Sequence, residues 1–180
     1  MCGAELVALP EAVQRVVAVL QARGHADMPV MLASAARTAQ QAADALGVEL
    51  GQIAKSIIFR RSAVAGPADD DVAVLVITAG DSRVDEAKVQ ALVCAPGTRL
   101  GKADAEFVKS RTGFAIGGVS PLAHAMSPVT LIDNSLLRFD AIWAAAGHPH
   151  SVFRLQPQDL VRYTAAPLAD VAQATECQAR

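Results

Sequence analysis

A lysine at the start of an apolar strand is the first residue able to carry chemistry. Lys55 follows a polar turn and precedes Ser56 and the apolar residues 57–59. An ammonium in this position either extends along the apolar surface to reach water, or lies in a cleft where it meets an anion or a polarised carbonyl. The surface arrangement is the commoner one for this spacing, and both remain open at this point.

A glycine-rich loop is the second feature, with the sequence TGFAIGGVSPLAH over residues 112–124. Gly117 and Gly118 allow close approaches of the backbone that side chains prevent, and Pro121 stiffens the exit of the loop. Consecutive amide N–H groups in such a loop can bind an oxyanion or a ribose hydroxyl. The loop is not a P-loop, because no Gly-Lys-Ser/Thr follows it, nor a dinucleotide fingerprint, because the third glycine is missing. It is either a backbone binding site or a tight turn.

Three polar side chains in or after this loop have open roles. His124 could move a proton near neutral pH, or could be a hydrogen-bonded structural residue. Ser120 is not expected to be a nucleophile, because GGVSP is not the GxSxG elbow and no acid and histidine complete a triad. Asp133, in LIDNSLL, either binds the amine of a ligand or caps the following turn, and the cap is the safer interpretation.

Histidines and cysteines do not form a recognisable metal site. His148 and His150 lie close together, but no third and fourth ligand is suitably spaced, and we predict that both lie on the surface. Cys2, Cys94 and Cys177 are odd in number and contain no CxxC pair, so neither a disulfide framework nor a zinc site is indicated. The sequence therefore predicts no metal, no cofactor and a reducing compartment.

Helices and strands that could position these groups alternate irregularly along the chain. Capping residues and apolar spacing predict helices over residues 11–23, 38–47, 84–93, 103–111 and 157–163. Apolar and β-branched runs predict strands over 28–34, around 57–59, and over 71–80, 129–137 and 151–155. The run 140–147 is compatible with a strand or with a buried helical turn. No steady βαβ rhythm is present, which favours an α+β or mixed-sheet single domain.

Composition limits the partners. The chain has 180 residues, of which 52% are hydrophobic and only 4% aromatic, so we expect an aliphatic core. Its net charge of −2 provides no overall basic field, so we expect no DNA binding and only a local contact with RNA. No apolar run is long enough to span a membrane and no export signal is recognisable, so we predict a cytoplasmic protein. The basic candidates for RNA contact are Arg60 and Arg61, followed by a second group, which could equally form a solvated face, of Arg99, Lys102, Lys109 and Arg111.

Four stretches taken together resemble the YbaK/EbsC family, which includes the ProX editing proteins and the insertion domain of bacterial prolyl-tRNA synthetases. They are GQIAKSIIF with Lys55, TGFAIGGVSPLAH, IDNSL and SVFRLQPQDLV. Their order and spacing match the family from about Val30 to Tyr163. The lysine together with the Gly-x-x-x-Pro loop is far more specific than either feature alone.

This resemblance implies a fold, a reaction and a set of site residues. The expected fold is α+β, with a mixed, barrel-like sheet flanked by helices, in a single domain over residues 1–180 with its core at about 30–165. The expected reaction is hydrolysis, without metal or cofactor, of the ester that joins an amino acid to the terminal ribose of mischarged tRNA. In the family, the lysine matching Lys55 anchors the substrate, and the loop containing Gly117 and Gly118 positions the ester through backbone atoms. The implied substrate contacts are Val119, Ser120, Pro121, His124 and Asp133.

Two departures bear on the substrate. The branch that deacylates Cys-tRNA carries an aspartate in the strand matching SVFRL, where this chain has Val152, and has no histidine at the position of His124. The resemblance therefore favours a ProX-type enzyme acting on Ala, Ser, Thr or another small residue, with tRNA and a synthetase as partners. The alternative is a non-catalytic module that binds an amino acid, a nucleotide or a tRNA end. Retention of both Lys55 and the loop favours the enzyme.

Overall fold

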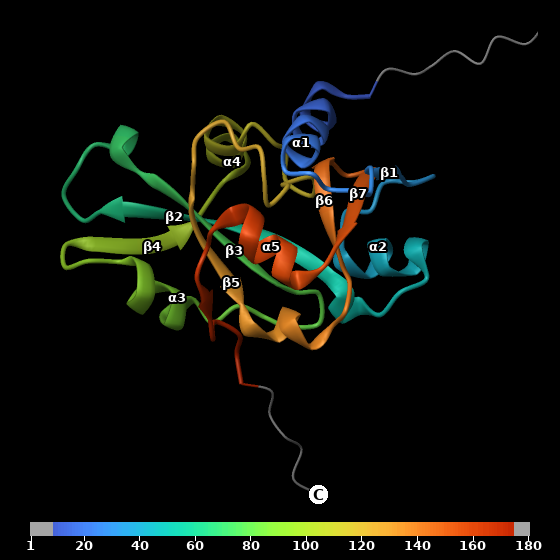
Figure 1. The fold of residues 1–180 in the computed structure, drawn as a ribbon. Helices are drawn as coiled ribbons and strands as arrows, with labels where there is room; N and C mark the ends of the chain where they lie inside the picture. The colour runs from blue at the N-terminus through green and yellow to red at the C-terminus, as the bar shows by residue number, and fades with distance from the viewer. Residues whose placement is uncertain (1–8, 175–180) are drawn as a thin grey trace, which may run out of the picture.

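A mixed β-sheet flanked by helices forms the protein in the computed structural model, which describes residues 9–174 (Figure 1). The strands are β1 (Val30–Met31), β2 (Ile53–Ala63), β3 (Val72–Ala79), β4 (Thr98–Lys102), β5 (Val129–Asp133), β6 (Ile142–His148), β7 (Ser151–Leu155) and β8 (Leu168–Ala169). The α-helices are α1 (Glu11–Ala22), α2 (Ala39–Leu46), α3 (Glu86–Val93), α4 (Ala105–Thr112) and α5 (Pro157–Thr164). Three short 3-10 helices are η1 (Leu50–Gln52), η2 (Ala68–Asp70) and η3 (Asn134–Arg138).

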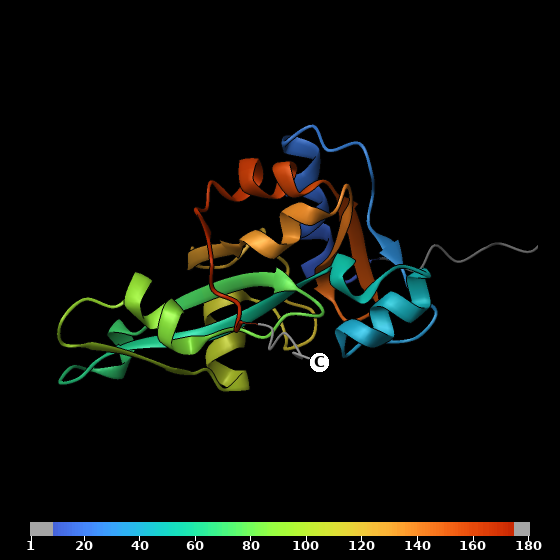
Figure 2. The same ribbon diagram turned by 90° about the horizontal axis from the view of Figure 1, so that it is seen from below.

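The strands follow the order β1-β7-β6-β2-β3-β5-β8, and β4 pairs with β2 off this path. The β2–β3, β2–β4, β6–β7 and β1–β7 pairs are antiparallel, whereas β2–β6, β3–β5 and β5–β8 are parallel. This arrangement confirms the expected α+β fold with a mixed sheet. Figure 2 shows that the β2–β3 hairpin extends away from the rest of the molecule as a long arm, with β4 and α3 beside it.

Strand β3 is at the centre of the core. Its side chains Leu75 and Ile77 pack into the main apolar cluster, together with residues of α1 and α5. The alternate side chains Val74 and Val76 pack into a second cluster on the opposite face, which includes residues of α3 and β5. Because both faces of β3 are buried, its sequence is continuously apolar rather than alternating. The strand prediction for residues 71–80 is confirmed.

The helix predictions are also confirmed, and their caps explain where α2 begins and ends. The Thr38 hydroxyl accepts a hydrogen bond from the Gln41 amide at 3.2 Å, and the Gln41 side chain accepts one from the Arg37 amide at 2.9 Å. These bonds satisfy donors that the first helical turn leaves without partners. Gly47 ends the helix in the left-handed conformation that favours glycine. Across residues 9–174, every helix is too short or too polar to cross a membrane.

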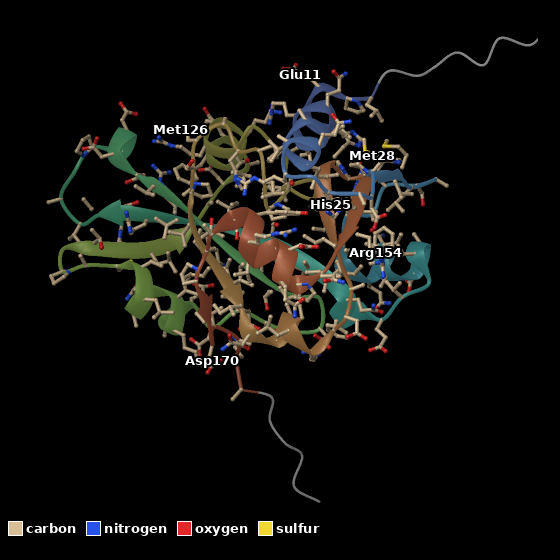
Figure 3. The ribbon with its side chains drawn as sticks, in the orientation of Figure 1. Glu11, His25, Met28, Met126, Arg154 and Asp170 are labelled. Atoms are coloured by element: carbon tan, nitrogen blue, oxygen red, sulfur yellow. The ribbon has the colours of Figure 1, made fainter. Side chains whose placement is uncertain are left out.

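Long-range contacts fix the helices on the sheet. His25, labelled in Figure 3, follows α1 and reaches two other elements. Its Nε2 lies 2.8 Å from the Arg154 carbonyl oxygen of β7, and its Nδ1 lies 3.2 Å from the Tyr163 hydroxyl of α5. The end of α1 is thereby joined to the β6–β7 side of the sheet, and α1 and α5 lie together on one face (Figure 2).

Several boundaries differ from the sequence prediction. The strand predicted over 28–34 is reduced to Val30 and Met31, both exposed, so the apolar run there does not report burial. The strand predicted over 129–137 ends at Asp133, because the Asp133 carboxylate caps η3. The run 140–147 forms strand β6 rather than a helical turn. Strands β4 and β8 were not predicted, because β4 contains a single apolar side chain, Leu100, and β8 is only two residues long.

Candidate functional site

The site begins at a gap beside strand β2. On one side β2 pairs with β3 continuously from Ala54 to Arg61. On the other side it pairs with β6 only at Ile53 and Ala54, and with β4 only from Phe59 onward. Within the described sheet, residues 55–58 therefore have no strand neighbour on that side. Because β4 and β6 leave β2 in different directions, an opening forms between them.

A cavity of about 390 Å³ occupies this opening. Its walls come from β2, the β6–β7 hairpin, the segment that begins α2, and the glycine loop at residues 116–119. Small side chains create much of its space, and the larger apolar side chains of the lining are Ile53, Ile57, Ile116, Val119, Trp143 and Val152. This is the size and character of a small-molecule site. The alanines of the lining are Ala36, Ala39, Ala42, Ala54, Ala144 and Ala145.

Lys55 lines the cavity and is half-buried. Its Nζ donates a hydrogen bond of 2.5 Å to the Ser82 carbonyl oxygen. Burial lowers the pKa of Lys55 below its usual value, the charge of Asp81 opposes this effect, and the charge of Arg83 adds to it. Of the two arrangements left open by the sequence, the structure favours the cleft, because Lys55 is half-buried in the cavity lining and its ammonium bonds to Ser82, a residue outside that lining.

The glycine loop packs against the turn between β6 and β7. A Cβ atom on Gly118 would lie 2.9 Å from the Cα of His148, which is closer than real contacts allow. The Gly118 amide donates to the Ala115 carbonyl oxygen, so its contribution is close packing rather than a free donor. Gly117 has a φ of +88°, and the amides of Gly117 and Val119 have no protein acceptor in the described chain. Both residues line the cavity, so their amides are donors available in its lining.

Ser120 and Pro121, both predicted substrate contacts, lie outside the cavity lining. Both residues are buried, and the Ser120 hydroxyl accepts a hydrogen bond from the Leu122 amide at 3.2 Å. This bond closes the turn that follows the glycines. The two residues support the loop from behind, whereas Val119, the third contact predicted in this segment, does line the cavity.

His124 also lies outside the lining, against Phe114. The two rings meet edge to face with centroids 5.8 Å apart, and the His124 Nε2 is buried without a hydrogen-bond partner. Burial lowers the pKa of His124 to about 4, a backbone hydrogen bond with Ser120 opposes the shift, and the charge of Arg15 adds to it. The imidazole is therefore neutral at pH 7, and its geometry is that of a packing residue rather than of a substrate contact.

Asp133 has a structural role. Its carboxylate accepts hydrogen bonds from the amides of Ser135, Val171 and Ala172 at 3.0–3.1 Å. The residue is 1% exposed and does not line the cavity. The turn-cap interpretation of Asp133 agrees with this geometry, and the predicted contact with substrate does not.

His148 corrects the prediction that both histidines of this turn lie on the surface. It is half-buried and lines the cavity. Its Nδ1 accepts a hydrogen bond from the His150 amide at 3.2 Å, so the neutral ring carries its proton on Nε2. The half-buried His150 has its Nδ1 3.2 Å from the Leu32 carbonyl oxygen. The sequence signal for His148 was its place in a short turn between two strands.

Groups able to bind a metal are not assembled in the described residues. No set of three or more His, Cys, Asp or Glu side chains converges within residues 9–174. Cys94 is a free, half-buried thiol. Cys2 and Cys177, which entered the sequence argument, lie outside the described residues.

Two serines of the lining were missed by sequence reasoning. The hydroxyls of Ser56 on β2 and Ser151 on β7 are buried, and neither has a hydrogen-bond partner in the protein. Ser151 is 0% exposed. A buried hydroxyl without a partner costs about 1–3 kcal/mol, so such groups are rare in folded proteins.

The predicted basic face lies at the other end of β2 and much of it is used by the fold. Arg60 pairs with Asp71 and stacks on the Phe107 ring. Arg61 donates to the Val93 carbonyl oxygen at 2.8 Å. By contrast, Arg37 is exposed, lines the cavity, and has no carboxylate within ion-pair distance in the described chain. Arg37 is therefore an exposed cation of the cavity lining that is available for a local contact with RNA.

Comparisons with known proteins identify the family. Residues 33–163 match the model of the aminoacyl-tRNA editing domain. The Bacillus subtilis (strain 168) protein YwhH, which is itself uncharacterised, is 33% identical over 127 residues, covering 71% of this chain and 74% of YwhH. A solved candidate trans-editing enzyme for prolyl tRNA synthetase superposes with a TM-score of 0.78 and 37% identity, covering 93% of this chain and 100% of that one. A scaffold from computational epitope grafting has a TM-score of 0.80 and 35% identity, covering 92% and 100% respectively.

Proposed function

Because this chain belongs to the aminoacyl-tRNA editing domain family, we propose that it is a cytoplasmic enzyme that hydrolyses the ester of mischarged tRNA in trans. The observation that carries this proposal is the cavity, which combines a lysine, two free amides and an apolar wall. One similar structure is described as a candidate trans-editing enzyme for prolyl tRNA synthetase, which supports a synthetase as the partner. The acceptor end of the tRNA would enter beside Arg37.

Hydrolysis requires a water molecule to attack the acyl carbon of the ester. The bond from that carbon to the ribose oxygen then breaks, which releases the amino acid and returns a proton to the ribose hydroxyl. Negative charge develops on the carbonyl oxygen during the attack, and amides aimed at that position stabilise it. The free amides of Gly117 and Val119 are suited to this role, and the Lys55 ammonium is suited to anchoring the substrate. Ser120 is too buried to act as a nucleophile.

Selection of the amino acid follows from the shape of the cavity. Its alanines leave room for a small side chain, and the walls that include Ile53, Trp143 and Val152 limit larger ones. One methylene more or less changes binding by only about 1–3 kcal/mol in such a pocket. We therefore propose a small aminoacyl substrate, drawn from Ala, Ser, Thr or Cys.

The test is a deacylation screen with tRNAs charged with Ala, Ser, Thr, Cys and Pro. Lys55→Ala should lower kcat/KM for the hydrolysed substrates about a hundredfold or more, as expected when a stabilising charge is removed from the reaction site. The matched control is Lys102→Ala, which removes an exposed lysine of β4 at the far end of β2 and should leave kcat/KM unchanged.

Two results would count against this proposal. A folded Lys55→Ala variant with an unchanged rate would remove Lys55 from the mechanism. If the unaltered protein hydrolysed none of the five substrates at high enzyme concentration, a non-catalytic module that binds an amino acid, a nucleotide or a tRNA end would become the better interpretation. Titration with amino acids and nucleotides would then identify its ligand.

A further inference from the structure

The ammonium group of Lys55 is held by a residue outside the cavity lining. Its Nζ donates to the Ser82 carbonyl oxygen at 2.5 Å, and Ser82 belongs to the turn that follows β3. This turn, residues 80–83, is here named the β3 turn, and a hydrogen bond of 3.0 Å from the Ser82 amide to the Ala79 carbonyl oxygen closes it. An ammonium group has three donors, and the described chain accepts from one of them, so two remain for water or a substrate.

An ion pair joins the β3 turn to η3. The Asp81 carboxylate pairs with the Arg138 guanidinium, which also lies over the Phe139 ring at 4.5 Å from its centroid. A Cβ atom on Gly51 of η1 would lie 2.8 Å from the Asp81 carboxylate, so η1 packs against this pair at a distance that only glycine allows. Because η1 leads directly into β2, the pair is enclosed by the element that precedes Lys55.

Stability alone does not account for this pair. The side chains of Asp81 and Arg138 are 44% and 43% exposed, and exposed ion pairs contribute little to the stability of a fold. The pair does affect Lys55. Burial lowers the pKa of Lys55, the charge of Asp81 raises it, and the charge of Arg83 lowers it further. The two residues that flank Ser82 therefore act on one ammonium in opposite directions.

We propose that Asp81 is a positioning residue for Lys55: it fixes the β3 turn, whose Ser82 carbonyl holds the ammonium, and it places a compensating negative charge beside that ammonium. This inference rests on the proposed deacylase function, in which Lys55 anchors the substrate. Asp81 is not a substrate contact, because it lines a separate hollow outside the cavity, together with Ser82 and Arg138. Its effect on the reaction therefore passes through Lys55.

The other titratable groups around Lys55 cannot take this role. Four of those that line the cavity or the hollow are cations or histidine, which cannot compensate an ammonium: Arg37, Arg83, Arg138 and His148. Glu49 lines the same hollow as Asp81, but it is the charge of Asp81 that raises the pKa of Lys55. Asp81 is therefore the carboxylate whose removal should change the behaviour of Lys55.

The first measurement is an NMR titration of the lysine side chains, which needs no substrate. The chain has only four lysines, and the ¹³Cε signal that disappears in Lys55→Ala is that of Lys55. The midpoint of its titration should move to lower pH in Asp81→Asn, which removes a charge that favours the ammonium. It should move to higher pH in Arg83→Gln, which removes a charge that opposes it.

Asp170→Asn is the matched control for Asp81→Asn. Asp170, labelled in Figure 3, is another exposed carboxylate, and it pairs with the Lys88 ammonium at 3.0 Å. This variant should leave the Lys55 midpoint unchanged, because the charge that it removes is paired with a different lysine. Unchanged Lys55 midpoints in both Asp81→Asn and Arg83→Gln, or shifts in the same direction, would overturn the inference.

Kinetics then test whether Asp81 acts on the reaction through Lys55. With a hydrolysed aminoacyl-tRNA, Asp81→Asn should lower kcat/KM about 3- to 10-fold, the contribution of one hydrogen bond. In the Lys55→Ala background, the same substitution should have no further effect. An equal loss in both backgrounds would overturn the inference, because a general disturbance of the fold does not require Lys55. If the unaltered protein hydrolyses no ester, the deacylase proposal fails, and the NMR titration still decides whether the β3 turn holds Lys55.

Discussion

The two ends of strand β2 use their polar groups in opposite ways. At its far end, from Phe59 onward, β2 has a strand on each side, and Arg60 forms an ion pair with the buried Asp71. At its near end, residues 55–58 have a strand on one side only, and Ser56 has no partner for its hydroxyl. One continuous strand thus contains a fully satisfied region and an incompletely satisfied one.

This difference between the two ends of β2 indicates which of them can bind a ligand. Hydrogen bonds and ion pairs within the protein complete the far end, so it has little left to offer a substrate. The near end borders the cavity, where the buried Ser56 and Ser151 hydroxyls lower stability because they have no partner, and where the Gly117 and Val119 amides have no protein acceptor. Changes at the near end should therefore affect activity, and changes at the far end should affect stability.

The largest effect that tests this separation is expected from Gly118→Ala. The new Cβ would lie 2.9–3.0 Å from three backbone atoms of His148, so the loop and the β6–β7 turn must move apart. A displacement of this kind misplaces the Gly117 and Val119 amides, and we expect kcat/KM for deacylation to fall about a hundredfold. Steady-state kinetics with a hydrolysed aminoacyl-tRNA provides the measurement.

Gly101→Ala is the matched control for this substitution. Gly101 lies in β4 at the far end of β2, and its new Cβ would have one ordinary contact, 3.9 Å from the Arg60 carbonyl oxygen. This variant should keep full activity. Equal losses of activity in the two variants would show that the ends of β2 are not functionally separate.

The far end is tested by Asp71→Asn. Burial raises the pKa of Asp71, but hydrogen bonds from Arg60 and Ser62 and the charges of Arg60 and Arg111 lower it by more, so the net shift is downward. The carboxylate therefore stabilises the fold at pH 7, and this contribution is lost as the pH falls through the lowered pKa. Asp71→Asn should lower the free energy of unfolding by about 1–3 kcal/mol in urea at pH 7 while kcat/KM stays unchanged.

Asp70→Asn provides the comparison for Asp71. Asp70 is the exposed neighbour in η2 and has no ion pair in the described chain, so its substitution should leave the unfolding curve unchanged. A loss of deacylation in folded Asp71→Asn would contradict the assignment of the far end to stability alone.

The fold was predictable from the sequence where burial and local signals agree. The run 71–80 is apolar because β3 is buried on both faces, and Thr38 and Gly47 mark the ends of α2 through bonds within a few residues. The strand predicted over 28–34 is only two residues long in the structure, and both are exposed. An apolar run does not indicate whether another element packs against it. Strand β4 was not predicted because it pairs with β2 through backbone hydrogen bonds, which do not depend on the side chains.

The candidate site was predictable only for distinctive residue types. Lys55 and the paired glycines stand out in the sequence, and both contribute to the cavity region. Ser56 and Ser151 are ordinary residues, and their place in the cavity lining arises from the divergence of β4 and β6 around β2, which no local pattern encodes. His148 was set aside because it lacked metal partners, although a cavity histidine needs none.

His124 sharpens the comparison, because its Nε2 is buried without a partner although the residue does not line the cavity. Its effect should therefore be on stability, and it should depend on pH. The pKa of His124 is about 4 in the folded protein and about 6.5 in an unfolded chain, so the unfolded state takes up a proton first as the pH falls. The free energy of unfolding should then decrease from pH 6.5 toward pH 4, and His124 should add no further dependence below that range.

The measurement is urea unfolding of the unaltered protein and of His124→Leu at pH 7 and pH 4.5. Leucine does not titrate, and the difference between the two proteins cancels the other ionisable groups. Because the ring is partly exposed and therefore partly screened, we expect the unaltered protein to lose only about 1–2 kcal/mol more than the variant across this interval. Equal losses would mean that His124 is protonated as easily in the folded state as in the unfolded one. If folded His124→Leu instead had a lower kcat/KM at pH 7, His124 would contribute to activity as well as to stability, as the sequence predicted.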